Sequence, residues 1–143
     1  MGDTASKTEA LAALASRWSR LPSVQKLATG RSLALLLSTV QLLPYVPDAS
    51  PGVDDVCDPA VILSRGGDCE DRAALFAALA RAAGYRAELV WQSQEADQDH
   101  VTVRVWIDGA WRWADPTVPG AAIGEEPHDA ARRTGYSARL KGA

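Results

Sequence analysis

The sequence has little of what several large classes of protein need. Only two of its 143 residues are cysteine, too few for the disulfide framework of a small secreted domain. Fifteen basic residues stand against 18 acidic ones, and the net charge of -3 argues against a nucleic-acid-binding protein. The longest apolar run, Leu33 to Leu37, is far too short to cross a bilayer. Since the start also lacks a signal-peptide pattern, the sequence predicts a cytoplasmic protein with reduced thiols, with signal-free export as the alternative.

What is present is a helical first half and a strand-forming second half. Apolar residues recur at the helical period and predict helices over about 6–21, 23–29, 31–43 and 68–83. After Gly84 the period changes to two and predicts strands over about 86–91, 100–107 and 110–115. Residues 44–67 are rich in proline and glycine, which indicates a loop. The prediction is one α+β domain over residues 1–143, with its core at about 31–120 and a mobile tail from 121 to 143.

Cys69 stands in the first turn of the helix predicted from Asp68. Unpaired backbone N–H groups and the helix dipole favour a thiolate at such a position. A thiolate is the nucleophile that amide and ester chemistry requires. Taken alone, a buried structural thiol explains this cysteine better, because free cysteine is common in protein cores.

His100 and Asp115 are predicted to meet on one hairpin. If Asp108-Gly109 forms a two-residue turn, Trp106 pairs with Trp111, Arg104 with Trp113 and Thr102 with Asp115. His100 and Asp115 then become diagonal neighbours on one face, at a Cα separation of about 7–8 Å. An aspartate that holds an imidazole in one tautomer is the third member of a catalytic triad.

The triad also makes a prediction about packing. For the second ring nitrogen of His100 to reach Cys69, we expect the Cys69 helix to pack against the sheet face that carries Arg104 and Trp113. Trp106, Trp111 and Trp113 are interpreted as packing residues. Cys57 lies in the proline-rich loop and His128 in the tail, and the two cysteines and two histidines are not spaced as a zinc site.

Three segments of the chain resemble the transglutaminase-like superfamily. Gly66-Gly67-Asp68-Cys69-Glu70-Asp71 is similar to its nucleophile segment, and His100-Val101-Thr102-Val103 is similar to its histidine strand. Trp111-Arg112-Trp113-Ala114-Asp115-Pro116-Thr117 is similar to its closing motif, and Tyr45-Val46-Pro47-Asp48 to the segment before the nucleophile. The resemblance covers about residues 35–120, and it implies a papain-like fold with Cys69, His100 and Asp115 as the triad.

The chain most resembles short transglutaminase-like proteins of bacteria and tailed phages. Its Asp68-Cys69-Glu70-Asp71 also matches bacterial transglutaminase-like cysteine proteinases. That match implies a calcium site at Asp68, Glu70 and Asp71, whereas their position alone predicts helix capping. Related enzymes also carry an oxyanion donor upstream of the cysteine, for which Gln41 is the candidate beside the Cys69 backbone N–H.

Three functions are compatible with these residues. The first is a cysteine peptidase or amidase that hydrolyses a protein or peptide substrate through a thioester and requires no cofactor. The second is a crosslinking acyltransferase, in which an amine resolves the same thioester. The third is a binding or structural module, such as a phage-associated one, that has kept the triad without turnover. A fold shared by many functions does not choose among them.

Overall fold

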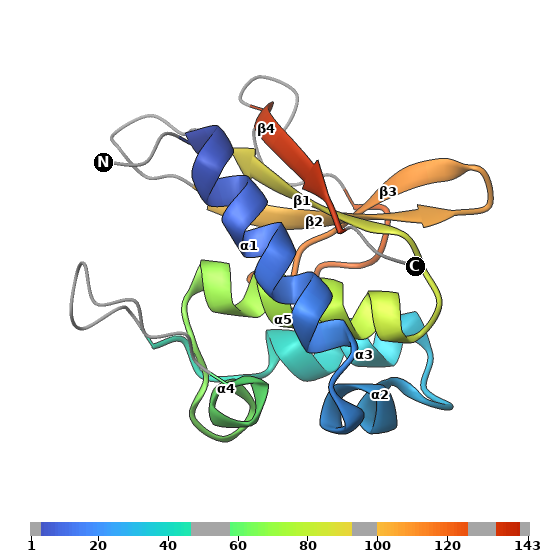
Figure 1. Ribbon diagram of the computed structural model, residues 1–143. Helices are drawn as coiled ribbons and strands as arrows, with labels where there is room; N and C mark the ends of the chain where they lie inside the picture. The colour runs from blue at the N-terminus through green and yellow to red at the C-terminus, as the bar shows by residue number, and fades with distance from the viewer. Residues whose placement is uncertain (1–3, 47–57, 93–99, 126–133, 141–143) are drawn as a thin grey trace.

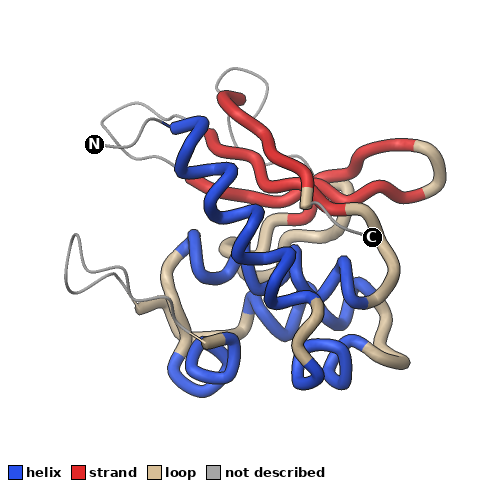
Figure 2. Tube along the Cα trace, viewed as in Figure 1, coloured by secondary structure: helices blue, strands red, loops and turns tan. Residues whose placement is uncertain are grey.

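Helices fill the first half of the chain and strands the second, as the two hydrophobic periods predict. The computed structural model describes residues 4–46, 58–92, 100–125 and 134–140. The helices in these ranges are α1 (Thr4–Ser19), α2 (Pro22–Ala28), α3 (Leu33–Gln41), α4 (Pro59–Arg65) and α5 (Cys69–Ala82). The strands are β1 (Ala87–Gln92), β2 (His100–Ile107), β3 (Ala110–Ala114) and β4 (Thr134–Arg139). The predicted α+β class is confirmed, and Figure 2 shows the strands gathered on one side and most helices on the other.

Side-chain caps fix where the helices begin. The hydroxyl of Ser32 accepts a hydrogen bond from the backbone N–H of Leu35 at 3.1 Å and starts α3. Helix α4 lies where the sequence predicted only loop. Asp58 caps it by accepting from the N–H of Ala60 at 2.8 Å, and Pro59 occupies its first turn. Across the described ranges, every helix is too short or too polar to cross a membrane.

The sheet is antiparallel, with the strand order β3-β2-β1-β4. Its β2–β3 hairpin has the predicted two-residue turn, in which Asp108 (φ 50°) and Gly109 (φ 81°) both adopt left-handed conformations. Ile107 therefore pairs with Ala110, and the ladder continues to its last pair, Val103 with Ala114. The predicted register of this hairpin is confirmed.

The expected mobile tail is wrong for residues 134–139. These residues form β4, which pairs with β1 along the edge that β2 leaves open. Helix α1 also packs against β4 (Figure 1). The segment TGYSAR has only a short apolar alternation, Tyr136 and Ala138, so pairing with β1 accounts for its strand conformation better than the local pattern does.

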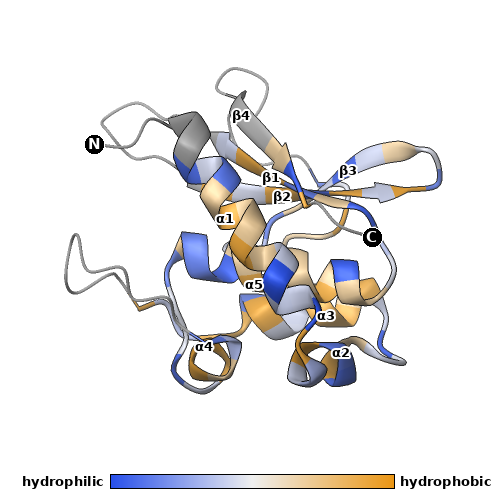
Figure 3. Ribbon diagram, in the orientation of Figure 1, coloured by the Kyte–Doolittle hydropathy of each residue, from blue (hydrophilic) through white to orange (hydrophobic). Residues whose placement is uncertain are grey.

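One face of the sheet packs against α5, and it is the face opposite to the one that the triad hypothesis required. The side chains of Val101, Val103 and Val105 are buried in one cluster with Phe76 and Leu79 of α5. Arg104 and Trp113 belong to the other face, because side chains alternate along a strand. The prediction failed because burying the valines outweighs presenting the polar face to a helix. Figure 3 shows hydrophobic residues on strands β1 and β2 and on the helices.

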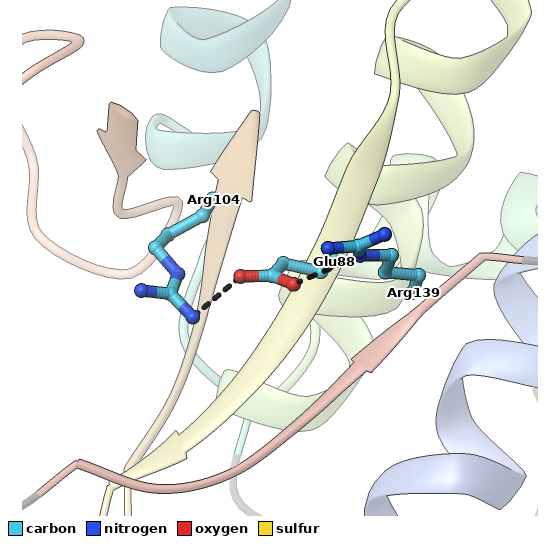
Figure 4. A network of polar contacts seen from close by, with 3 residues as sticks. All are labelled: Glu88, Arg104 and Arg139. Carbon is cyan, nitrogen blue, oxygen red and sulfur yellow. Dashed lines mark ion pairs between the residues drawn. The ribbon is translucent and has the colours of Figure 1, made fainter. Parts of the chain in front are cut away.

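The outer face of the sheet carries arginine and tryptophan around a buried carboxylate. Glu88 forms ion pairs with Arg104 and, at 3.8 Å, with Arg139 (Figure 4). Arg104 stacks on the ring of Trp113 at 5.0 Å. The rings of Trp106 and Trp111, which face each other in the register, pack edge to face at 5.4 Å. These contacts support the interpretation of the tryptophans as packing residues.

Candidate functional site

Cys69 is the first residue of α5, as the sequence predicted, and it is a half-buried free thiol. Asp68 caps the helix by accepting a hydrogen bond from the N–H of Asp71 at 2.9 Å. Asp71 completes the capping box by accepting from the N–H of Asp68 at 3.2 Å. The thiol therefore stands at the positive end of the helix dipole, in a first turn held by the two capping hydrogen bonds.

The glycine pair before Cys69 lets a second segment approach closely. Gly66 has φ 89°, and a Cβ there would overlap with the carbonyl oxygen of Pro44. The N–H of Gly67 donates to that same carbonyl at 3.2 Å, and the N–H of Val46 donates to the Gly67 carbonyl at 3.1 Å. Tyr45 and Gly67 form an isolated parallel β-bridge. Residues 44–46 are thus fastened to the turn that presents Cys69.

Arg72 reinforces this fastening and was missed by the sequence analysis. Its side chain is only 3 % exposed, and its guanidinium donates to the Gly67 carbonyl at 3.1 Å and to the Leu43 carbonyl at 2.6 Å. It also lies over the ring of Tyr45, with its central carbon 5.5 Å from the ring centre. The sequence signal for this role was a single arginine directly before the apolar residues 73–80. An arginine in such a position is buried, and a buried arginine requires hydrogen-bond partners.

Tyr45, which the sequence marked only as part of the segment before the nucleophile, also lies beside the start of α5. Partial desolvation of its hydroxyl raises the pKa of Tyr45, and the negative charges of Cys69 and Asp68 raise it further, while Arg72 opposes them. Its bridge to Gly67 and its contact with Arg72 place Tyr45 beside the start of α5. Its side chain is exposed to solvent.

The carboxylates around Cys69 act as helix caps in this structure. Burial and the neighbouring charge of Asp68 raise the pKa of Asp71 from 3.8 to about 6. Among the described residues, no three histidine, cysteine, aspartate or glutamate side chains are grouped so that they could hold a metal ion. Asp68, Glu70 and Asp71 therefore do not fit a calcium site as they stand, because capping turns two of them towards the backbone.

Asp115 follows the last residue of β3 and is 3 % exposed. One carboxylate oxygen, Oδ1, accepts a hydrogen bond from the N–H of Thr117 at 2.9 Å. The side-chain amide nitrogen of Gln41 donates to the Asp115 backbone carbonyl at 3.0 Å and to the Ala121 carbonyl at 2.8 Å. Both amide hydrogens of Gln41 are thus used, which does not support the oxyanion role that the sequence suggested for it.

Residues 41–46 connect the two halves of the site. Gln41 holds Asp115, Leu43 accepts from Arg72, and residues 44–46 lie against the turn before Cys69. The structure therefore brings Cys69 and Asp115 to the same end of α3. His100 is the first residue of β2 and pairs with Gln92 of β1. It lies three residues before Val103, which forms the last β2–β3 pair with Ala114, the residue before Asp115. Cys57 and His128 lie outside the described residues.

Solved structures with a similar fold include a protein of Cytophaga hutchinsonii provisionally assigned as a cysteine protease. It is 22 % identical, with a TM-score of 0.50 over 83 % of this chain and 48 % of its own. This chain thus spans about half the length of that relative. Calcium-bound LapG of Legionella pneumophila is also 22 % identical, with a TM-score of 0.53 over 96 % of this chain and 76 % of its own.

A second LapG structure is 18 % identical and has a TM-score of 0.54, covering 94 % of this chain and 85 % of its own. At these identities the comparisons establish the fold. No curated protein sequence matches the chain. The model of the transglutaminase-like superfamily matches residues 28–116, which include Cys69, His100 and Asp115. The chain therefore belongs to the transglutaminase-like superfamily.

Proposed function

We propose that this protein is a thiol enzyme that cleaves an amide bond of a protein or peptide by means of Cys69, His100 and Asp115. The observation that carries the proposal is the connection made by residues 41–46, which ties Asp115 and the Cys69 turn to one structural element. A purely structural cysteine would not need to stand half-buried at a helix start. Because α5 packs on the other face of the sheet, the proposal requires His100 and Asp115 to reach Cys69 around the end of the β2–β3 ladder, beyond its last pair, Val103 with Ala114.

The proposed reaction has two steps, formation of a thioester and its hydrolysis. The Cys69 thiolate attacks the substrate carbonyl carbon, and the imidazolium of His100 gives its proton to the departing amine, which leaves a thioester. His100 then takes a proton from water, whose oxygen attacks the thioester carbon, and the products are a carboxylic acid and the regenerated thiol. In both steps the backbone N–H of Cys69 stabilises the oxyanion, and Asp115 orients His100.

Selective labelling tests the nucleophile. Cys69 at the helix start should react with iodoacetamide much faster than Cys57 in the folded protein, and Cys69→Ala should remove all labelling by acyl probes. Equal rates at the two cysteines would argue strongly against the triad. Adding a primary amine distinguishes the alternatives: release of an acid supports hydrolysis, and amide formation supports the crosslinking acyltransferase.

Asparagine substitutions test the aspartate. Asp115→Asn should reduce turnover by several orders of magnitude, on the order of 10⁴, because the amide no longer selects the correct imidazole tautomer. Asp108→Asn is the matched control. It makes the same chemical change at the exposed hairpin turn, where asparagine tolerates the left-handed conformation, and it should leave turnover unchanged. A non-catalytic module would show no turnover in either background.

Calcium is a separate question, because one similar structure is calcium-bound LapG. In this chain burial is the main cause of the raised pKa of Asp71 and the charge of Asp68 the second, and a cation would offset the second. The capping hydrogen bonds of Asp68 and Asp71 oppose the binding of a cation. Calorimetric titration with calcium decides between the two. Heat of binding that disappears in Asp71→Asn would support a calcium site, and no heat at millimolar calcium would leave the capping role.

A further inference from the structure

Gln41 is a buried amide whose nitrogen donates to two carbonyls of the segment after β3. Its side chain is 5 % exposed at the last position of α3, and its amide nitrogen donates to the carbonyls of Asp115 and Ala121. Its partners are 74 and 80 residues away in the sequence. The two ends of the loop over residues 115–121 therefore converge on one NH₂ group.

Asp115 stands where the sheet no longer supports its backbone. The last pair of the β2–β3 ladder is Val103 with Ala114, so the ladder ends one residue earlier. Beyond that point the carboxylate is held by its own short turn to the N–H of Thr117. The amide of Gln41 supplies a long-range tie, since it holds the carbonyl of Asp115 against α3.

We propose that Gln41 is a positioning residue, which fixes the Asp115 backbone so that the carboxylate orients His100. This inference rests on the proposed function, because it assigns Gln41 a role in the triad described there. The physical reason is that both amide hydrogens converge on two carbonyls, an arrangement that only a planar NH₂ donor of this length supplies. A carboxylate or an apolar side chain of the same size cannot reproduce it.

The experiment replaces Gln41 and reads the state of His100 directly. Gln41→Met keeps the length of the side chain and removes both donors, and Gln41→Glu keeps the shape and replaces donors with acceptors. Val40→Ala is the matched control, because it damages the core one residue earlier on α3 without touching Asp115. The first readout is the imidazole tautomer of His100 from ¹⁵N NMR, which is simple because the chain has two histidines and His128→Gln removes the other.

The second readout is the rate of Cys69 alkylation at neutral pH, measured also in the Asp115→Asn background. We expect Gln41→Met to mix the His100 tautomers and to slow alkylation about tenfold, as a displaced catalytic group does. In the Asp115→Asn background the same change should have almost no further effect, because both substitutions act through one carboxylate. Val40→Ala should leave the tautomer unchanged even where it lowers stability.

The outcomes separate the inference from the proposed function. If Asp115→Asn changes the tautomer and the alkylation rate while both Gln41 variants change neither, the positioning role is refuted and the triad stands. Additive effects of Gln41→Met and Asp115→Asn on the rate would also refute it. If Asp115→Asn itself has no effect, the triad and the positioning role fail together. Should Gln41→Glu not fold, Gln41→Met gives the same decision.

Discussion

Replacing Arg72 with leucine tests the fastening of the Cys69 turn. The substitution leaves an apolar side chain of smaller size in the core and removes two charged donors. The Leu43 carbonyl loses the Arg72 donor, and the Gly67 carbonyl keeps the N–H of Val46. A hydrogen bond from a charged group contributes about 1.5–3 kcal/mol, and part of the loss is recovered when a carbonyl reaches water. With Leu43 half-buried, we expect a net loss of about 3 kcal/mol in the free energy of unfolding.

Thermal unfolding followed by circular dichroism measures this loss. For a chain of this length 1 kcal/mol corresponds to roughly 3–4 °C, so Arg72→Leu should lower Tm by about 10 °C. Arg72→Lys, with one ammonium in place of two separated donors, should lose about half as much. Arg81→Leu on the last turn of the same helix is the control and should change stability by no more than about 0.5 kcal/mol. Equal losses for Arg72→Leu and Arg81→Leu would refute the reasoning.

Three further experiments test separate features. The carboxyl of Asp71 loses its proton near pH 3.8 in the unfolded chain and near pH 6 in the folded one, so the free energy of unfolding falls as pH rises between these values. Asp71→Asn should remove this contribution, which is about 1 kcal/mol after solvent screening. Urea titrations at several pH values measure it. Gly66→Ala should destabilise by about 2 kcal/mol more than Gly30→Ala, because both have positive φ but only the first meets backbone atoms; equal midpoints would contradict this. Arg104→Met should lower Tm clearly and Arg139→Met little, since the first contacts the buried carboxylate closely and the second is mostly exposed; the reverse order would be contrary to the ion-pair geometry.

The parts of the fold that could be predicted are those with local signals. The capped start of α5 and the Asp108-Gly109 turn are each determined by residues that are neighbours in the sequence. The position of Cys69 on its helix and the hairpin register could therefore be predicted. Helix α4 had a local signal too, Asp58 before Pro59, but the surrounding prolines and glycines outweighed it. The strand β4 had only a weak signal, the alternation of Tyr136 and Ala138, and its partner β1 is distant in the sequence.

The site divides in the same way. Cys69 and Asp115 could be selected from the sequence because their residue types, positions and spacing suit a triad. The roles of Gln41 and Arg72 depend on backbone carbonyls distant in the sequence, and no residue type marks a carbonyl as needing a partner. The face against which α5 packs was predicted wrongly for a related reason. The prediction was based on the need of His100 to reach Cys69, whereas the packing of α5 is determined by the burial of Val101, Val103 and Val105.

The pairing of β4 with β1 has a consequence for how the chain acquires its structure. The match to the superfamily spans residues 28–116, while α1 precedes this region and β4 follows it, and these two elements pack against each other. A fragment limited to the matched region would leave the backbone of β1 unpaired along one edge and its apolar residues bare where α1 had covered them. Such an edge invites pairing with another copy of the fragment. During synthesis the same edge stays open until residue 139 has left the ribosome, so the sheet is completed only after the whole region matched to the superfamily has been made.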